Sequence, residues 1–184
     1  YGLIDLSMSL DQIGPIARTP DDCEMIFNVI KGKDEHDALT REFQNNQKKE
    51  IKIGMLEMPA DQKIEKLVKE KTEVILKKKK WKLQKISLNH TNLGIQTYYP
   101  IVYAEFFSGT RKFDGRKYGL KIEESAGEEV IRRILGGQEI TKAEFEGKYY
   151  QRALQAKKII EKEFESAFKK VEVLILPTVP RIPH

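Results

Sequence analysis

The sequence predicts an α/β fold in which a mixed, largely parallel sheet is covered by helices. Short apolar segments at 51–56 and 83–88 flank a helical pattern, and a strand–helix–strand unit of this length places its two strands parallel, with a right-handed crossover. Apolar runs at 1–6 and 173–176 predict two further buried strands. We therefore expect a layered domain of strands and covering helices.

The composition is that of a charge-rich globular protein. Of the 184 residues, 33% are charged and 40% are hydrophobic, and no run approaches the ~20 apolar residues that a membrane span needs. A single cysteine, Cys23, excludes an internal disulfide and favours a reducing cytoplasm. We expect one domain over residues 1–184, located in the cytoplasm without membrane attachment.

The net charge of +5 raises the question of nucleic-acid binding. Lys77–Lys80 form one basic run at the predicted end of a helix, where cations complement the helix dipole. The other basic residues are interleaved with glutamates, and no RNA-binding signature with aromatics among the basic residues is present. This pattern favours a solvated helical face over a nucleic-acid platform.

A strong helix start follows the first apolar run. Thr19 is a predicted N-cap, Pro20 suits the first helical position, and Asp22 suits the positive end of the helix dipole. We expect a helix over residues 20–31. Cys23 falls on its apolar face without a histidine beside it, so a packed thiol is favoured over a nucleophile.

The middle of the chain predicts a connection and then a helix. Residues 33–50 are polar without a clear period and predict a surface connection. Asp61 can cap the helix that ends near Trp81. The apolar positions of this helix keep to one face; they are Ile64, Leu67, Val68, Val74 and Ile75.

Two helices are predicted in the aromatic and glycine-containing part of the chain. The aromatic pattern over 98–108 predicts a helix that starts close to Thr97, because Pro100 is best tolerated in a first turn. A short helix at 127–135 is expected to end at Gly136–Gly137.

The last predicted helix is long. It is expected over about 141–170, with an apolar stripe that recurs at steps of three or four from Tyr149 to Val171. Lys157 lies within the stripe, where its stem can be buried and its head kept at an edge. The proline-rich run at 177–183 predicts a rigid extended exit, which leads us to expect more chain beyond His184.

The segment 111–119 is the one irregular stretch that suggests a binding site. It holds two glycines, several cations and two aromatics without a helical or strand period, and binding residues concentrate on loops. An ordinary surface loop is the simpler interpretation of the same composition.

A self-sufficient active site is not visible. No phosphate-binding glycine loop or GxSxG elbow occurs, and His36, His90 and His184 lack the spacing of a metal site. The adjacent pairs Glu123–Glu124 and Glu128–Glu129 are expected to be solvated. Catalytic and metal-binding residues are therefore not predicted from the residues themselves.

Several segments share motifs with a known family. They are Tyr1–Ile4, Ser9–Pro15, Ala17–Asp22, Arg111–Gly119, Glu129–Gly136, Tyr149–Tyr150 and Val173–Thr178. The chain resembles the amidase signature family, and within it the glutamine-hydrolysing subunits of tRNA-dependent amidotransferases. The likeness is weakest over residues 57–97 and covers only the central portion of the family's length.

The resemblance implies an amidase-signature fold and hydrolysis of glutamine. The family's serine nucleophile, second serine and lysine are expected upstream of Tyr1, so residues 1–184 alone are expected to be inactive. Tyr118 matches a tyrosine near the bound glutamine, and Lys157 matches an arginine that grips the substrate carboxylate. Because lysine cannot make the two-pronged contact of arginine, a weaker contact, an alignment shifted by one residue, or simple packing are alternatives for Lys157.

The resemblance also implies partners. Glutamine is the expected substrate, and no cofactor or metal is expected on this chain. The ammonia would pass to a partner subunit of a heterotrimer, which uses ATP and magnesium to amidate Glu-tRNA(Gln). Two other hypotheses stay open: an amidase-signature hydrolase of another amide, and a non-catalytic interaction or RNA-binding α/β domain.

Overall fold

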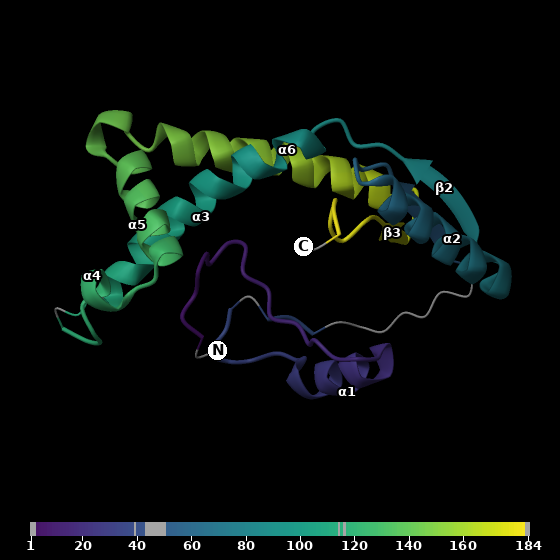
Figure 1. Ribbon diagram of the computed structural model, residues 1–184, viewed down its shortest axis with the longest axis horizontal. Coiled ribbons are helices and arrows are strands. Elements are labelled where there is room, and N and C mark those ends of the chain that lie inside the picture. The colour runs from purple at the N-terminus through teal and green to yellow at the C-terminus, as the bar shows by residue number, and fades with distance from the viewer. Residues whose placement is uncertain (1–2, 39, 43–50, 114, 116, 183–184) are drawn as a thin grey trace. The chain divides into compact units, whose positions relative to one another are not determined.

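The computed structural model describes residues 3–38, 40–42, 51–113, 115 and 117–182 (Figure 1). The chain divides into two compact units. The first consists of Tyr1–Asn46 and Tyr98–Gln151, and the second of Gln47–Thr97 and Arg152–His184. The single domain expected from the sequence stays a prediction.

The described chain combines helices with three short strands. The helices are α1 (Pro20–Ile30), α2 (Gln62–Lys79), α3 (Gly94–Thr110), α4 (Ile122–Ser125), α5 (Glu128–Ile140) and α6 (Lys148–Phe168). The strands are β1 (Lys52–Leu56), β2 (Lys82–Ile86) and β3 (Val173–Ile175), and the 3-10 turns are η1 (Thr91–Leu93), η2 (Arg111–Phe113) and η3 (Ala143–Phe145). Within the described ranges, no helix has both the length and the apolar character that crossing a bilayer requires.

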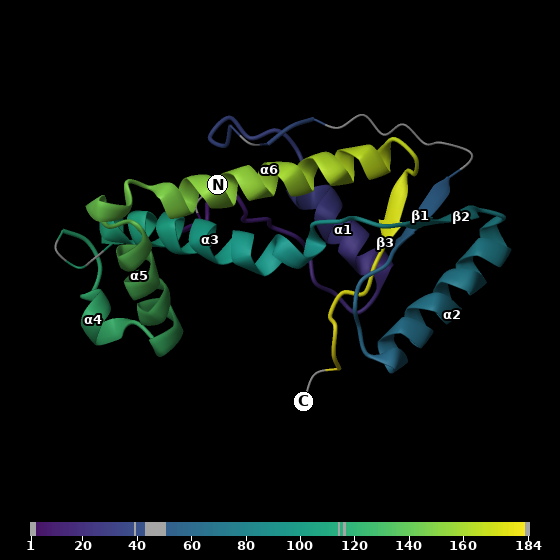
Figure 2. The same cartoon turned by 90° about the horizontal axis from the view of Figure 1, so that it is seen from above.

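The second unit is built on a three-stranded parallel sheet in the order β2-β1-β3 (Figure 2). Ile53 of β1 lies opposite Leu83 of β2 and Val173 of β3. The strand–helix–strand prediction for β1, α2 and β2 is thus confirmed. The prediction that 173–176 is a buried strand is wrong for its side chains, because β3 lies at a sheet edge and Val173 and Leu176 are about two-fifths exposed.

The core of the second unit joins the sheet to the end of α6. Its buried members are Leu56, Ile86, Ala167 and Val171, with Met58, Leu88, Phe164 and Leu174 packed against them. Gly54 allows this packing, because a Cβ on Gly54 would lie 2.7 Å from both Ile86 Cγ1 and Leu174 Cδ2. The apolar stripe predicted on α6 therefore covers the sheet with its C-terminal half.

The start of the chain differs from the prediction. Residues 3–6 form no strand, and Leu3 and Ile4 are 67% and 62% exposed, while residues 1–2 lie outside the described part. An apolar run becomes a strand only when a partner satisfies its backbone, and the described residues supply none here. The predicted cap is confirmed, since the Asp22 amide donates to Thr19 Oγ1 at 3.2 Å.

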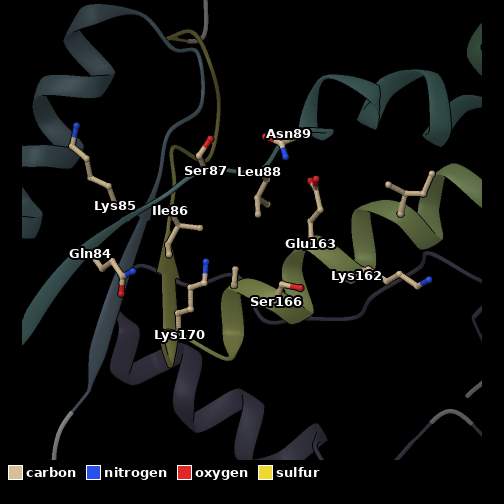
Figure 3. A pocket seen from close by; sticks show the side chains of 12 residues that line it. Gln84, Lys85, Ile86, Ser87, Leu88, Asn89, Lys162, Glu163, Ser166 and Lys170 are labelled. Atoms are coloured by element: carbon tan, nitrogen blue, oxygen red, sulfur yellow. The ribbon is translucent and has the colours of Figure 1, made fainter.

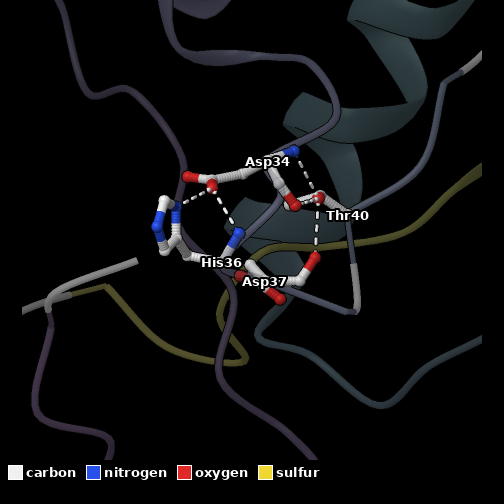
Figure 4. A network of polar contacts seen from close by, with 4 residues as sticks. All are labelled: Asp34, His36, Asp37 and Thr40. Atoms are coloured by element: carbon white, nitrogen blue, oxygen red, sulfur yellow. Dashed lines mark hydrogen bonds and ion pairs between the residues drawn. The ribbon is translucent and has the colours of Figure 1, made fainter.

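Helix α1 has no buried residue, so its predicted apolar face is not covered within the described chain. Cys23 is half-buried, and its Sγ lies 3.9 Å from the Pro15 carbonyl oxygen. Within the predicted connection, side-chain and backbone groups of Asp34, Asp37 and Thr40 form hydrogen bonds (Figure 4). There the Asp34 amide donates to Thr40 Oγ1 at 2.8 Å, and the Thr40 hydroxyl contacts the Asp37 carbonyl at 2.8 Å.

Helices α3 and α5 pack closely in the first unit. Helix α5 continues to Ile140, so the prediction that Gly136–Gly137 ends it is wrong. A Cβ on Gly137 would lie 2.1 Å from the Tyr103 carbonyl oxygen, and one on Gly136 would lie 2.6 Å from the Tyr103 ring. The two glycines serve close approach of the helices instead of a helix end.

Two predicted helix starts are also wrong. Helix α3 starts at Gly94, before the predicted Thr97, and holds Pro100 in its interior. Helix α6 starts at Lys148 and not near Thr141, because Glu146 and Gly147 have φ angles of 49° and 71° that a right-handed helix excludes.

Candidate substrate-binding site

The loop after α3 is held by two glycines. Gly115 and Gly119 have φ angles of 77° and 78°, a region that favours glycine. The Gly115 amide donates to the Tyr118 carbonyl at 3.1 Å, and a Cβ on Gly115 would lie 2.5 Å from the Lys121 nitrogen. Asp114 and Arg116 of the predicted binding segment lie outside the described residues.

Tyr118 lies at the surface of the first unit. Its side chain is 63% exposed, and the Lys117 ammonium stands 5.9 Å from the ring centroid. The phenol hydroxyl can therefore reach a ligand without displacing a packed neighbour. This placement is compatible with the ligand contact that the resemblance implies.

Lys157 lies in α6, within the part of that helix that belongs to the second unit. Its side chain is 30% exposed, and its Nζ lies 3.6 Å from Glu161 Oε1, one helical turn later. This partial exposure is compatible with the predicted arrangement, in which the stem is buried and the charged head lies at an edge. Tyr118 and Lys157, the two predicted binding residues, thus belong to different compact units.

A polar cluster around Glu105 in the first unit was missed by the sequence reasoning. Glu105 Oε2 accepts from the Ser7 hydroxyl at 2.6 Å and the Ser9 amide at 3.1 Å, and Oε1 accepts from the Ser9 hydroxyl at 2.7 Å and the Tyr150 hydroxyl at 2.8 Å. Ser7 is fully buried. The only available signal was one acidic residue within the aromatic run of α3, since the partners lie 45 to 98 residues away in sequence.

The cluster fixes its own ionisation. Burial alone would raise the pKa of Glu105, but the hydrogen bonds from Ser7, Ser9 and Tyr150 outweigh it and hold that pKa below its ordinary value. Burial and the neighbouring Glu105 carboxylate raise the pKa of Tyr150 to about 12. A carboxylate occupied by four donors is an anchor for segment 7–9 and Tyr150, and it is unsuited to proton abstraction.

The second unit has a cavity of about 410 Å³ between the carboxyl end of β2 and α6 (Figure 3). At its rim, His90 Nδ1 lies 2.7 Å from Glu163 Oε1, and the His90 amide donates to Glu163 Oε2 at 3.1 Å. The contacts with His90 hold the pKa of Glu163 below its ordinary value. Ser87, Asn89 and Ser166 add polar groups to the lining.

The described residues hold no group of three or more His, Cys, Asp or Glu side chains that could bind a metal.

The chain is similar to known proteins over its whole length. The amidase family model matches residues 1–184. The chain is 44% identical to the glutamyl-tRNA(Gln) amidotransferase subunit designated A of Methanocaldococcus jannaschii. That alignment is 190 residues long and covers 100% of this chain and 44% of that protein. It is 38% identical to the same-named protein of Methanothermobacter thermautotrophicus over 100% of this chain and 42% of the relative. The chain thus spans less than half the length of these curated relatives.

Two solved structures share the fold. The same-named amidotransferase subunit of Thermotoga maritima matches with a TM-score of 0.71 and 27% identity, over 98% of this chain and 40% of that one. Allophanate hydrolase of Kluyveromyces lactis matches with a TM-score of 0.62 and 22% identity, over 88% of this chain and 26% of that one, which shows the fold alone. The fold prediction is confirmed by both. From its whole-length match to the family model and its similarity to these relatives, the chain belongs to the amidase family.

Proposed function

We propose that the protein containing this chain is the glutaminase subunit of a tRNA-dependent amidotransferase. The observation that carries the proposal is 44% identity over the entire chain to curated proteins named as the glutamyl-tRNA(Gln) amidotransferase subunit designated A. The surroundings of Tyr118 support it, because Gly115 and Gly119 adopt left-handed φ angles on either side of this exposed tyrosine.

The proposed reaction is hydrolysis of the side-chain amide of glutamine. A serine oxygen attacks the amide carbon, the C–N bond breaks with protonation of the leaving nitrogen, and water then cleaves the acyl-enzyme to glutamate. The serines and the lysine that the resemblance implies are expected upstream of Tyr1. The ammonia converts Glu-tRNA(Gln) to Gln-tRNA(Gln) on a partner subunit that uses ATP and magnesium, in the cytoplasm.

Within this scheme the described residues bind substrate. The Tyr118 hydroxyl donates a hydrogen bond to glutamine, and the Lys157 ammonium pairs with the glutamine α-carboxylate. Lysine provides one point charge where arginine would provide two parallel donors, so the contact is weaker than an arginine contact.

The test is glutamine-dependent ammonia release by the full-length protein, purified with its partner subunits and assayed with and without ATP and Glu-tRNA(Gln). We expect ammonia release from glutamine and formation of Gln-tRNA(Gln). Hydrolysis of a different amide with no response to glutamine would instead establish the general amidase alternative. No hydrolysis of any amide would leave the non-catalytic alternative.

Lys157 gives a sharper test of the binding site. Lys157→Gln should raise KM for glutamine about 10- to 100-fold with a small change in kcat, since a charge-assisted hydrogen bond contributes about 1.5–3 kcal/mol. The exposed neighbour Lys158 provides a matched control, and Lys158→Gln should leave both constants unchanged. Equal, small effects of the two substitutions would assign Lys157 to packing alone.

A further inference from the structure

The two compact units carry opposite net charges. The second unit contains 20 lysines and arginines against 10 aspartates and glutamates, a formal charge of +10. The first unit contains 13 against 18, a formal charge of −5. The net charge of the whole chain, +5, does not reveal that the two units have charges of opposite sign. Two of the unit boundaries fall inside α3 and α6, where the sequence gives no sign of a boundary.

Seven lysines of the second unit form what we call the basic surface. They are Lys77–Lys80, Lys82, Lys162 and Lys170, and all are exposed. Helix α2 passes directly into β2 through Lys80, whose φ of 56° makes the turn. Lys162 of α6 and Lys170, two residues after that helix, line one cavity together with the carboxyl half of β2, whereas Lys77–Lys80 and Lys82 lie at the amino end of the same strand.

The charge of the basic surface is not neutralised locally. Among the described residues, none of its seven lysines forms an ion pair. Two carboxylates of this unit are engaged with other partners: Glu57 lies 3.0 Å from Lys85, and Glu163 lies 2.7 Å from His90. In Figure 3 the Lys170 ammonium points into the space between β2 and α6, while Lys162 extends outward along the rim.

Structural roles explain part of this surface only. Lysines suit a helix C-terminus, and lysines on an edge strand prevent edge-to-edge pairing, which accounts for Lys77–Lys80 and Lys82. Lys162 lies inside α6 and meets neither need. The cavity that Lys162 and Lys170 line also offers the hydroxyl groups of Ser87 and Ser166 and the amide group of Asn89, which can donate hydrogen bonds to phosphate oxygens.

We propose that the basic surface binds the sugar–phosphate backbone of the tRNA substrate. The inference rests on the proposed function, which requires an RNA held by the assembly. The repeated phosphates of RNA match a run of unpaired ammonium groups, whereas the acidic first unit repels them. The contact positions the RNA without reading its sequence, since lysines on a surface meet phosphate groups and not base edges.

The test uses the full-length protein assembled with its partner subunits and a transcript of the glutamate-accepting tRNA. One variant carries Lys78→Gln, Lys82→Gln, Lys162→Gln and Lys170→Gln. The control variant removes the same charge from the first unit, with Lys31→Gln, Lys33→Gln, Lys142→Gln and Lys148→Gln. Binding is followed by fluorescence anisotropy between 50 and 200 mM salt, at about 25 °C.

We expect the first variant to bind the tRNA about 10-fold more weakly or worse at 100 mM salt, and its slope of log K against log salt to shrink by about 3 to 4. The control should keep the affinity and slope of the parent protein. Equal effects of the two variants, or no effect of either, would overturn the proposal. Loss of partner subunits from the first variant, with unchanged tRNA affinity of the remaining assembly, would assign the surface to an acidic protein and also overturn it.

Glutamine hydrolysis without tRNA is measured on the same samples. If the first variant hydrolyses glutamine normally and binds the tRNA as tightly as the parent protein, the proposed RNA-binding surface is wrong and the proposed glutaminase function is retained. If the first variant binds the tRNA more weakly but no sample hydrolyses glutamine, the proposed glutaminase function is wrong and the RNA-binding surface is retained.

Discussion

At the level of single residues, Gly137 shows how a side chain's absence can determine packing. The backbone of α5 approaches α3 so closely at this point that a methyl group would lie 2.4 Å from Phe107 Cβ as well as against the Tyr103 carbonyl. In the sequence, a glycine pair after a short helical pattern indicates a helix end. The glycine pair lies inside α5 and not at its end, and this becomes clear only when the close contact with α3 is known.

Gly137→Ala should therefore destabilise the full-length protein by about 1–3 kcal/mol, the usual range for overpacking a fixed contact. Gly94→Ala is the control, because nothing lies within 4 Å of its added methyl group. We expect the control to change the free energy of unfolding by less than about 1 kcal/mol. Urea unfolding measures both, and equal effects would show that α3 and α5 separate readily.

Glu105 gives a pH-dependent prediction. Its pKa is lowered in the folded state, so its hydrogen bonds contribute stability above the pKa of the unfolded chain. That contribution is lost as the pH falls through the lower, folded-state pKa. Glu105→Gln should thus destabilise the protein at neutral pH, and the difference in melting temperature from the parent should shrink on acidification. A difference that is constant with pH would show that the charge of Glu105 contributes nothing.

At the level of elements, helix starts depend on caps that are local in sequence. Thr19 with Pro20 and Asp22 gives the start of α1 correctly, because every group involved lies within four residues. The start of α6 was missed although Gly147 was visible as a helix breaker, because the predicted helix was extended back to Thr141, ahead of the apolar stripe that begins at Tyr149. The start of α3 shows the opposite error, because the predicted start close to Thr97 lies after the true start at Gly94. A helix interior can hold Pro100, since the φ of proline is helical and the helix loses one hydrogen bond only.

Thr19→Ala should cost α1 about 1 kcal/mol of stability, and Thr19→Ser should retain most of it. Because α1 has no buried residue, this loss is local and should leave the rest of the protein unchanged. Hydrogen exchange at the amides of Asp21 to Cys23 measures it. Exchange that is unaltered by both substitutions would mean that the cap is unimportant.

At the level of the whole molecule, the sequence predicts what is local and fails on what is distant. The parallel unit of β1, α2 and β2 followed from periodicity, and the family followed from motifs distributed along the chain. The Glu105 cluster could not be predicted, because Ser7 and Tyr150 approach it from remote segments. The opposite charges of the two units were also hidden, since each unit combines two separate stretches of chain.

The exposed apolar residues near the start of the chain predict the behaviour of residues 1–184 as a separate polypeptide. Ile16 is 96% exposed and Val29 is 81% exposed. The separate polypeptide should bind a hydrophobic dye and self-associate, and Ile16→Ser with Val29→Lys should reduce both. Matched changes at the exposed positions Gln12 and Asn28 should not. A monodisperse monomer on light scattering would contradict this prediction.

The glycine in the middle of β1 has an evolutionary consequence. Any larger residue at position 54 would meet Ile86 and Leu174 at 2.7 Å and Val171 at 3.0 Å, so it must be accompanied by a smaller residue at one of those positions. Position 54 is thus expected to co-vary with strands and a turn that lie 32, 117 and 120 residues further along the chain. A homologue with alanine at this site is expected to have valine in place of Ile86 or a shortened side chain in place of Leu174.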